Sequence, residues 1–489
     1  MLKNTFSFLL FTSLLLGETL PLQENQVSSA HASYDGKALI LEGRVQLNHG
    51  LGNISANQAF LQKQEEGKDF PFSLISLEKE VLLSLKNQSE IMCDSAELDF
   101  NALKGSLLSS ESKQVSYKNL FHKAGKQTVS LQLSSNAIDL QLAKKNNSPS
   151  EQTQYEIRSL LAKEKVLIHY AEDFTLEADE AAYYSLEARG PSSHSTLHAY
   201  PTKKHGKCTL SYQGESIETE SIDIDVDQNE LQIKQPKGFL PLAFFTQNQN
   251  GKLFFECQNL LWNHSKELLF LKEEVTLKET NLGCLYAKNE ITLEQGSSQS
   301  KQFIKSIHID GPSRLDYENI SDGWKHTVFC FGSLHIDGIK GQITLASPPE
   351  KEKQIRYVDN ELCLQSDNAF IEYSEQNSRP VSLTLKGNVT ITSSNLEEPL
   401  RCGIADRLTY SPDTQTVILA ALPKKRVLFS DAKQGISMSA LEVHLTKNLS
   451  TGETEAKGIG NVKFSLSTEE HALLKAWIPS FKEDLHETK

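Results

Sequence analysis

Apolar and polar residues alternate in short runs along most of the chain. The segment from Ile222 to Val226 alternates apolar and polar residues, and so does the segment from Val389 to Thr392. Successive side chains of a β-strand point to opposite faces, so this period of two predicts strands with one buried face. Turn signals such as Asp35-Gly36 and Gln213-Gly214 separate the runs. Helical periodicity is almost absent before residue 467, and the pattern predicts an all-β protein.

A nine-residue segment recurs within these runs. It reads LILEGRVQL at Leu39–Leu47 and LTLKGNVTI at Leu383–Ile391, with apolar ends around a polar centre. Looser copies lie at Ile75–Leu83, Leu160–Ile168 and Leu269–Leu277. Glycine at position five of the first and last copies, Gly43 and Gly387, predicts a corner or bulge in a curved sheet.

Each copy is followed by a second element that carries small residues. An apolar residue comes first, Ala or Cys stands two positions later, and Ala usually follows three positions after that. The five instances are Ile54-x-Ala56-x-x-Ala59, Ile91-x-Cys93-x-x-Ala96, Leu176-x-Ala178-x-x-Ala181, Leu285-x-Ala287-x-x-Glu290, which breaks the last position, and Leu400-x-Cys402-x-x-Ala405. Met438-x-Ala440-x-x-Val443 has the same form after Val427-Leu428-Phe429. Small residues recurring at one place indicate a close approach of two sheet faces, or a bend where a larger side chain would clash.

This pair of elements resembles the OstA-like domain of the lipopolysaccharide-transport proteins. The resemblance is closest at Ser33–Phe60 and Leu383–Phe464 and looser over residues 206–350. It implies an extended β-jellyroll, or β-taco, in which antiparallel strands stack into a folded-over sheet of two or three OstA-like units. It further implies a periplasmic protein that carries or bridges lipopolysaccharide, or a related glycolipid, between the inner and outer membranes.

The resemblance also implies where a lipid would bind and which partners the protein would have. Acyl chains would lie against the apolar face of the stack, and other OstA-like transport proteins would add to its ends by edge-strand pairing. No catalytic residue, metal or cofactor is expected. The expected lipid-binding residues are Leu39, Leu41, Val45, Leu47, Ile54, Leu383, Leu385, Val389, Ile391, Val427, Phe429 and Met438.

The amino terminus predicts export. Lys3 precedes an apolar run from Phe6 to Leu16, which is long enough for a signal peptide but too short to span a bilayer. We assign residues 1–20 to a cleaved signal peptide and expect a periplasmic protein, with an association with the outer membrane left open. The formal net charge of −13 argues against a nucleic-acid partner.

Composition shifts divide the rest of the chain. The expected units are residues 30–190, 206–346 and 356–466, and the Pro-containing linkers between them are 191–205 and 347–355. Residues 467–489 form a short helix and tail. There Ser467 and Glu470 have the spacing of a capping box, and Ala472, Leu473, Ala476 and Trp477 would line a helix that could cover the open end of the stack.

Other candidate chemistry is sparse. The seven cysteines are scattered, and no C-x-x-C pair occurs, so core positions are the preferred interpretation, with one or two disulfides left open. His194, His198 and His205, with Cys208 close behind, could ligate a metal, but their H-x-x-x-H spacing suits zinc only on a helix, which Pro191 disfavours.

Two alternatives to lipid transport remain from the sequence. One is an exported structural or adhesive β-solenoid that acts through its outer face, which a sealed core would favour. The other is a carbohydrate-active enzyme on a β-helix, whose two carboxylates could come from strands that hold acid pairs such as Glu273-Glu274 or Asp223/Asp225. An apolar groove along the stack would favour the lipid carrier.

Overall fold

The computed structural model describes most of the chain as antiparallel β-strands with one short helix at the carboxyl end, as the sequence predicts. It describes residues 26–62, 72–110, 113–121, 129–145, 154–171, 173–185, 194–242, 252–279, 283–298, 301–318, 325–349, 354–360, 362–374, 380–393, 401–432, 434–447 and 454–477. The predicted signal peptide, and Leu400 of the repeat, lie outside these residues. No helix among the described residues has both the length and the hydropathy needed to cross a membrane.

The chain forms two compact units. Unit 1 comprises residues 1–119 and 136–158, and unit 2 comprises residues 120–135 and 159–489. The first strands are β1 (Val27–Ser28), β2 (His31–Tyr34), β3 (Ala38–His49), β4 (Gly52–Gln62), β5 (Leu74–Leu85), β6 (Glu90–Asp99), β7 (Lys104–Leu108), β8 (Val115–Phe121), β9 (Val129–Ser135), β10 (Ala137–Lys145), β11 (Gln154–Tyr170) and β12 (Phe174–Tyr184). In unit 1, the long strands β3, β4, β5 and β6 pair in chain order.

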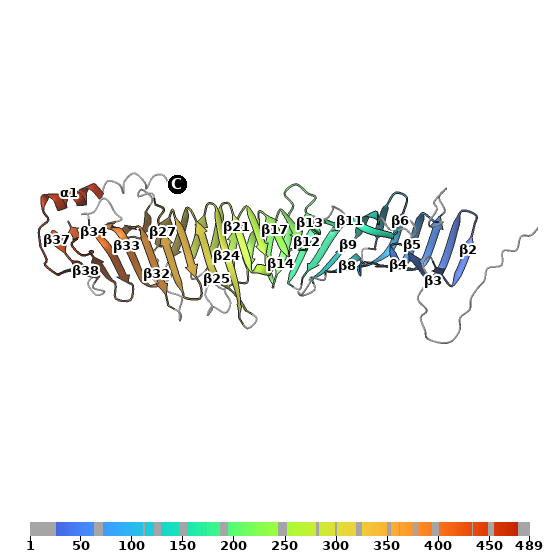
Figure 1. Ribbon diagram of the computed structural model, residues 1–489, viewed down its shortest axis with the longest axis horizontal. Helices are drawn as coiled ribbons and strands as arrows, with labels where there is room; N and C mark the ends of the chain where they lie inside the picture. The colour runs from blue at the N-terminus through green and yellow to red at the C-terminus, as the bar shows by residue number, and fades with distance from the viewer. Residues whose placement is uncertain are drawn as a thin grey trace, which may run out of the picture. The chain divides into compact units, whose positions relative to one another are not determined.

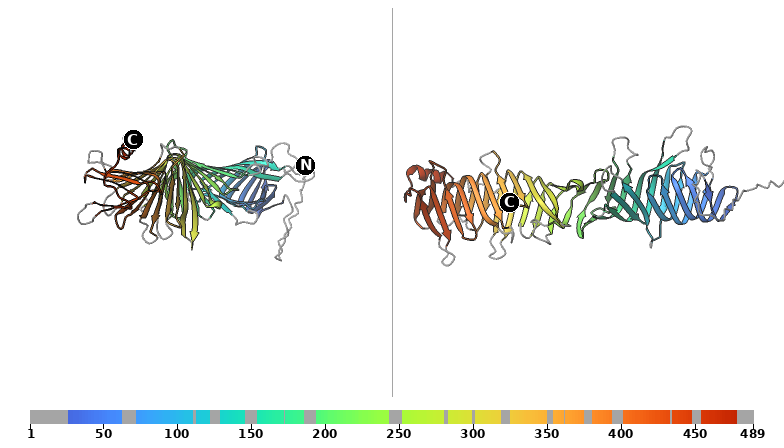
Figure 2. Two further views of the ribbon diagram at one scale, coloured as in Figure 1. Left: turned by 60° about the vertical axis from the view of Figure 1, so that its left-hand side comes forward. Right: turned by 60° about the horizontal axis from the view of Figure 1, so that its bottom comes forward.

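The remaining strands belong to unit 2, where they follow one another in chain order (Figures 1 and 2). They are β13 (Thr196–Tyr200), β14 (Cys208–Tyr212), β15 (Glu215–Thr219), β16 (Ser221–Asp225), β17 (Glu230–Lys234), β18 (Lys237–Leu240), β19 (Leu253–Glu256), β20 (Asn259–Asn263), β21 (Leu268–Lys272), β22 (Val275–Glu279), β23 (Gly283–Ala287), β24 (Glu290–Ser298), β25 (Lys301–Asp310), β26 (Ser313–Glu318), β27 (Lys325–Cys330), β28 (Ser333–Asp337), β29 (Gln342–Ala346), β30 (Ile355–Val358), β31 (Leu362–Ser366), β32 (Asn368–Tyr373), β33 (Pro380–Ser393), β34 (Arg401–Ser411), β35 (Thr416–Ala420), β36 (Val427–Asp431), β37 (Ile436–Ala440), β38 (Glu442–Lys447) and β39 (Thr454–Ile459).

Strand pairing in unit 2 builds two walls. The first wall runs β13–β16–β17–β20–β21–β24–β25–β28–β29–β32. The second wall runs β14–β15–β18–β19–β22–β23–β26–β27–β30–β31. Strands therefore alternate between hairpin partners and partners three strands away. β13 lies within residues 191–205, which the sequence pattern predicts to be a linker. Strand pairing therefore continues through part of that segment.

Long strands join the two walls at a bulge. The first half of β33 pairs with β32 and its second half pairs with β31, and the register shifts between Lys386 and Val389. We call the line of such corners the spine; it includes residues 220, 235–236, 257–258, 273–274 and 387–388. Backbone hydrogen bonds join successive corners, for example from Gln235 N–H to Gln258 O at 2.7 Å. The mouth is the opposite end of the walls, marked by the turn residues 171, 173, 226–229, 264–267, 432, 434 and 435.

The sequence repeat encodes these corners. Positions five and six of every copy have positive φ; they are Gly43 and Arg44, Lys79 and Glu80, Glu164 and Lys165, Glu273 and Glu274, and Gly387 and Asn388. Two left-handed residues opposite one partner residue form a bulge that turns the strand, which confirms the corners predicted at Gly43 and Gly387. Asn57, Asp94, Asp179 and Asp406 lie opposite four of these pairs.

The small residues of the second element pack directly inside the corner. Ala56 pairs with Val45 of the preceding strand, and Ala287 pairs with Val275 in the same way. Both alanines are buried at the corner, where the close packing of a protein interior leaves little room for a longer side chain. In the last full copy, Val389 pairs with Ala405, so the small residue at the corner is Ala405. The sequence pattern predicted Cys402 at this position, which is wrong by three residues.

The predicted helix is α1 (Thr468–Trp477), and its capping box is confirmed. Ser467 N–H donates to Glu470 Oε2 at 2.7 Å, and Glu470 N–H donates to Ser467 Oγ at 3.2 Å. Its buried contact is Leu474, which packs against Cys402 and Leu428. In β36, Leu428 stands between Val427 and Phe429, which are buried in the interior, so Leu428 lies on the opposite, outer face. The helix α1 therefore covers the outer face of the sheet at β34 and β36 (Figure 1). The expected contact residues Ala472, Leu473 and Ala476 are instead exposed.

Candidate functional site

The residues expected to bind lipid lie on the inner faces of the two units. Their fractional exposure is at most 9% with the exception of Leu39, which is half-buried. The buried ones are Leu41, Val45, Leu47, Ile54, Leu383, Leu385, Val389, Ile391, Val427, Phe429 and Met438. The alternation predicted from sequence is thus observed, since Gln46, between Val45 and Leu47, is exposed.

These residues form one group in each unit. In unit 1, Leu47 pairs with Ile54 across β3 and β4. In unit 2, Phe429 pairs with both Met438 and Gly403, and Gly403 pairs with Ile391. A Cβ at Gly403 would lie 2.8 Å from Ile391 Cγ2, so the absence of a side chain lets β33 and β36 side chains meet. The inner face is therefore tightly packed at this level.

Contacts across the mouth close the interior of unit 2. Tyr170 ends β11, which joins the second wall through β12. Its hydroxyl donates to Asn229 Oδ1, in a turn of the first wall, at 2.7 Å. Asp173 and His264 approach at 3.8 Å between the same two walls. Further along, Gln434 Nε2 donates to Thr454 O at 2.9 Å. Both Tyr170 and Asn229 are buried, so the first of these contacts excludes solvent.

An aromatic cluster fills the interior behind these contacts. Phe174 stacks on Tyr212 with ring centroids 4.9 Å apart, and Trp262 meets both rings edge-on. Burial lowers the pKa of neighbouring His264, although the charge of Asp173 acts in the opposite direction. The Nε1 of fully buried Trp262 has no hydrogen-bond partner among the described residues. Sequence reasoning missed this cluster because its members come from three separate strands and a turn.

All seven cysteines are free thiols, and six of them are buried. Burial raises the pKa of Cys93, Cys208 and Cys257 to about 12 and that of Cys363 to about 11. A thiol with such a pKa stays protonated near neutral pH and is a poor nucleophile or metal ligand. The prediction that these cysteines occupy core positions is confirmed for six, while Cys284 is half-buried.

The structure separates the histidines and cysteine of the 194–208 segment. His198 bonds to Asp223 on the neighbouring strand, His205 is exposed, and Cys208 is buried in the interior. His194 lies instead near Asp225 and Asp227, which are distant in sequence. The acid pair Glu273-Glu274 occupies a left-handed corner, where both side chains are exposed.

Comparisons with known proteins do not add a family assignment. No family model matches the chain, and no curated protein matches it significantly. The function is therefore inferred from the geometry of the chain's own residues.

Proposed function

We propose that this protein is an exported, periplasmic lipid-binding protein that carries or bridges lipopolysaccharide, or a related glycolipid, between the inner and outer membranes. One observation carries the proposal. Five sequence repeats each place a left-handed pair at a corner, and in unit 2 the corners join two walls whose facing side chains are apolar. An apolar interior between two hinged walls is suited to acyl chains, and this arrangement agrees with the resemblance of the repeats to OstA-like domains.

The closed interior is compatible with that role only if the walls can part. Apolar surface that has no ligand to cover it is costly to expose to water, so an empty interior is expected to collapse and pack. Lipid entry would then replace contacts between the walls with contacts to acyl chains. The mouth contacts Tyr170–Asn229 and Gln434–Thr454 are the ones that entry would break.

Photo-crosslinking tests the proposal. Photo-leucine at Leu47 or Ile391 should capture lipopolysaccharide or lipid A from mixed micelles. Photo-leucine at Gln46 should not, because the side chain of Gln46 points outward while those of Val45 and Leu47 point inward. Asn388, at the exposed corner, is the matched control in β33. Mass spectrometry of lipid that co-purifies with the unmodified protein provides the identity of the ligand. Equal labelling at inner and outer positions, together with no co-purifying lipid, would reject the proposal.

A second candidate is an exported structural β-solenoid that acts through its outer face. The specific observation in its favour is the sealed interior, in which Val389, Phe429 and Met438 are each at most 1% exposed. It predicts that the interior positions remain unlabelled even at saturating lipid. The same crosslinking experiment therefore separates the two candidates.

A further inference from the structure

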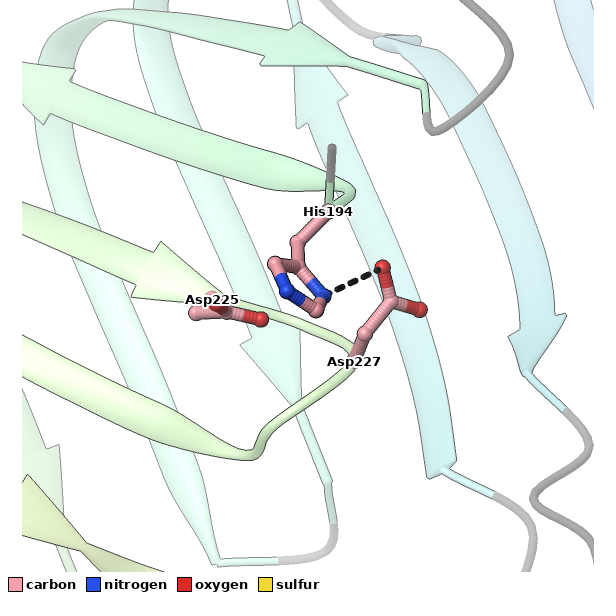
Figure 3. Close-up of side chains that lie close together, drawn as sticks. All are labelled: His194, Asp225 and Asp227. Atoms are coloured by element: carbon pink, nitrogen blue, oxygen red, sulfur yellow. Dashed lines mark ion pairs between the residues drawn. The ribbon is translucent and has the colours of Figure 1, made fainter. Parts of the chain in front are cut away.

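Three side chains of metal-ligating type converge at the mouth of unit 2. His194 lies two residues before β13, Asp225 ends β16, and Asp227 lies in the turn that leads to β17. One ligand atom from each lies within 4.8 Å of the other two. Figure 3 shows the imidazole directed toward the space between the two carboxylates. The three lie at adjacent ends of two neighbouring strands, because β13 pairs with β16.

Backbone groups hold both carboxylates in place. Ser195 N–H donates to Asp227 Oδ2 at 2.6 Å, and Gln228 N–H donates to Asp225 Oδ1 at 2.9 Å. Each carboxylate has a second oxygen that remains available for a ligand. The His194 Nδ1 forms a long ion pair with Asp227 Oδ2 at 4.0 Å, which is too far for a hydrogen bond (Figure 3). The other ring nitrogen, Nε2, lies within hydrogen-bond distance of Gln228 Nε2, at 3.3 Å. The Nδ1 of His194 therefore faces Asp227 without a hydrogen bond to it.

The site is negatively charged and open to solvent. The side chains of His194 and Asp227 are 47% and 33% exposed, so an ion can reach them. Burial raises the pKa of Tyr170, and the negative charges of Asp225 and Asp227 raise it further. A cation between the two aspartates would relieve the repulsion between them.

We propose that His194, Asp225 and Asp227 bind one divalent cation of the zinc class. An imidazole nitrogen with two carboxylate oxygens is a donor set that Zn²⁺ accepts, whereas Ca²⁺ and Mg²⁺ prefer oxygen ligands alone. Three protein ligands leave at least one coordination position for water. The ion would fix the 225–229 turn, and that turn carries Asn229, the partner of Tyr170 across the mouth. The proposal stands apart from any lipid-binding role.

Zinc binding to the full-length protein, measured by competition with a chromophoric chelator, tests the site. We expect one Zn²⁺ per chain, and an affinity that falls by more than about ten-fold in both H194A and D225N, since loss of even an outer-shell partner costs that much. H198A is the matched control, because His198 lies four residues further along the chain, in β13, and bonds to Asp223. The zinc affinity of H198A should equal that of the unchanged protein. Excess Ca²⁺ should not displace the zinc.

A spectroscopic readout keeps the test independent of folding. X-ray absorption of the zinc-loaded protein should show only nitrogen and oxygen ligands, with one imidazole among them. If H194A disturbs the turn, D225N still tests the site, because the substitution preserves the size of the side chain. Absence of zinc binding at micromolar metal would overturn the proposal and leave a solvated acidic turn. Equal zinc affinity in H194A, D225N and the unchanged protein would overturn it as well, since the metal would then lie elsewhere.

Discussion

Asp406 accepts a hydrogen bond at 2.8 Å from the backbone N–H of Leu422, and this contact ties one corner of the spine to the next. Asp406 lies opposite the left-handed pair Gly387–Asn388. Asp94 and Asp179 hold the same position in two other copies, where they accept from Ser110 N–H and Thr202 N–H. These backbone hydrogen bonds lower the pKa of Asp94 and Asp179. The aspartate is therefore a structural part of the corner.

Substitution of Asp406 should destabilise unit 2. D406A leaves the Leu422 amide without its acceptor and removes the ion pair to Lys425, which lies 2.6 Å away. The free energy of unfolding should fall by about 1–3 kcal/mol, measured from urea denaturation followed by far-UV circular dichroism. D406N retains an acceptor oxygen and should lose less. Equal losses in the two variants would show that the hydrogen bond to the amide is unimportant.

Removing a glycine and introducing one at the fifth position of the repeat should have opposite effects on stability. Gly387 has φ of +78°, and a Cβ there would lie 2.5 Å from Asp367 Oδ2, so G387A should lower the free energy of unfolding by about 1–2 kcal/mol. Lys79 occupies the same position of another copy with φ of 63°. K79G relieves the left-handed strain there and should leave stability unchanged or raise it by up to about 1 kcal/mol. Hydrogen exchange of the β33 amides in G387A and of the β5 amides in K79G measures the two changes in stability. Equal effects in the two variants would contradict the corner assignment.

Two adjacent leucines of α1 provide a further test. Leu474 is 4% exposed against Cys402 and Leu428, whereas Leu473 is 53% exposed. L474A should destabilise the docked helix by about 2 kcal/mol or more, while L473A should change stability by less than about 0.5 kcal/mol. Limited proteolysis after residue 467 should accelerate only in L474A. Faster cleavage in L473A would show that the helix packs through the face that carries Leu473.

Unit 1 should lose stability at mildly acidic pH. Burial lowers the pKa of His49 to about 4, and its Nδ1 accepts from Leu51 N–H at 3.2 Å. The unfolded chain, with a histidine pKa near its usual value of about 6.5, binds the proton more readily than the folded unit. The stability that neutral His49 provides is therefore complete above about pH 6.5 and declines as the pH falls toward 4, by on the order of 3 kcal/mol.

Hydrogen exchange of β3 amides at pH 7 and pH 4.5 measures this loss, after correction for the intrinsic exchange rate. H49Q retains an acceptor that does not titrate in this range, so the variant should lose less stability between the two values. The same pH dependence in both proteins would assign it to other groups.

Cysteine reactivity should follow burial. With iodoacetamide at pH 8, the half-buried Cys284 should react first, and the six buried thiols should react only after denaturation, because their pKa values keep them protonated and the interior excludes the reagent. Mass spectrometry of the native and denatured protein counts the labelled sites. Rapid native labelling of Cys257 or Cys363 would show that the walls open readily.

Local features of this protein could be predicted from its sequence. The alternation that places Val45 and Leu47 inward is a property of any strand, and the corners at Gly43 and Gly387 follow from the preference of glycine for positive φ. The capping box of Ser467 and Glu470 likewise involves residues three apart. Each of these depends on neighbours along the chain, so a sequence pattern suffices to find it.

Features that depend on which strands become neighbours were decided by the tertiary structure. Lys79 and Glu80 form the same left-handed corner as Gly43 without glycine, because pairing on both sides holds the bulge in place. The contact of Tyr170 with Asn229, and the approach of His194 to Asp225, require strands to pair three positions apart, which no local pattern specifies. The outward face that Leu474 covers exists only after β34 and β36 have paired. Alternation determines which side of a strand is apolar, but only the packing of the walls determines what each side meets.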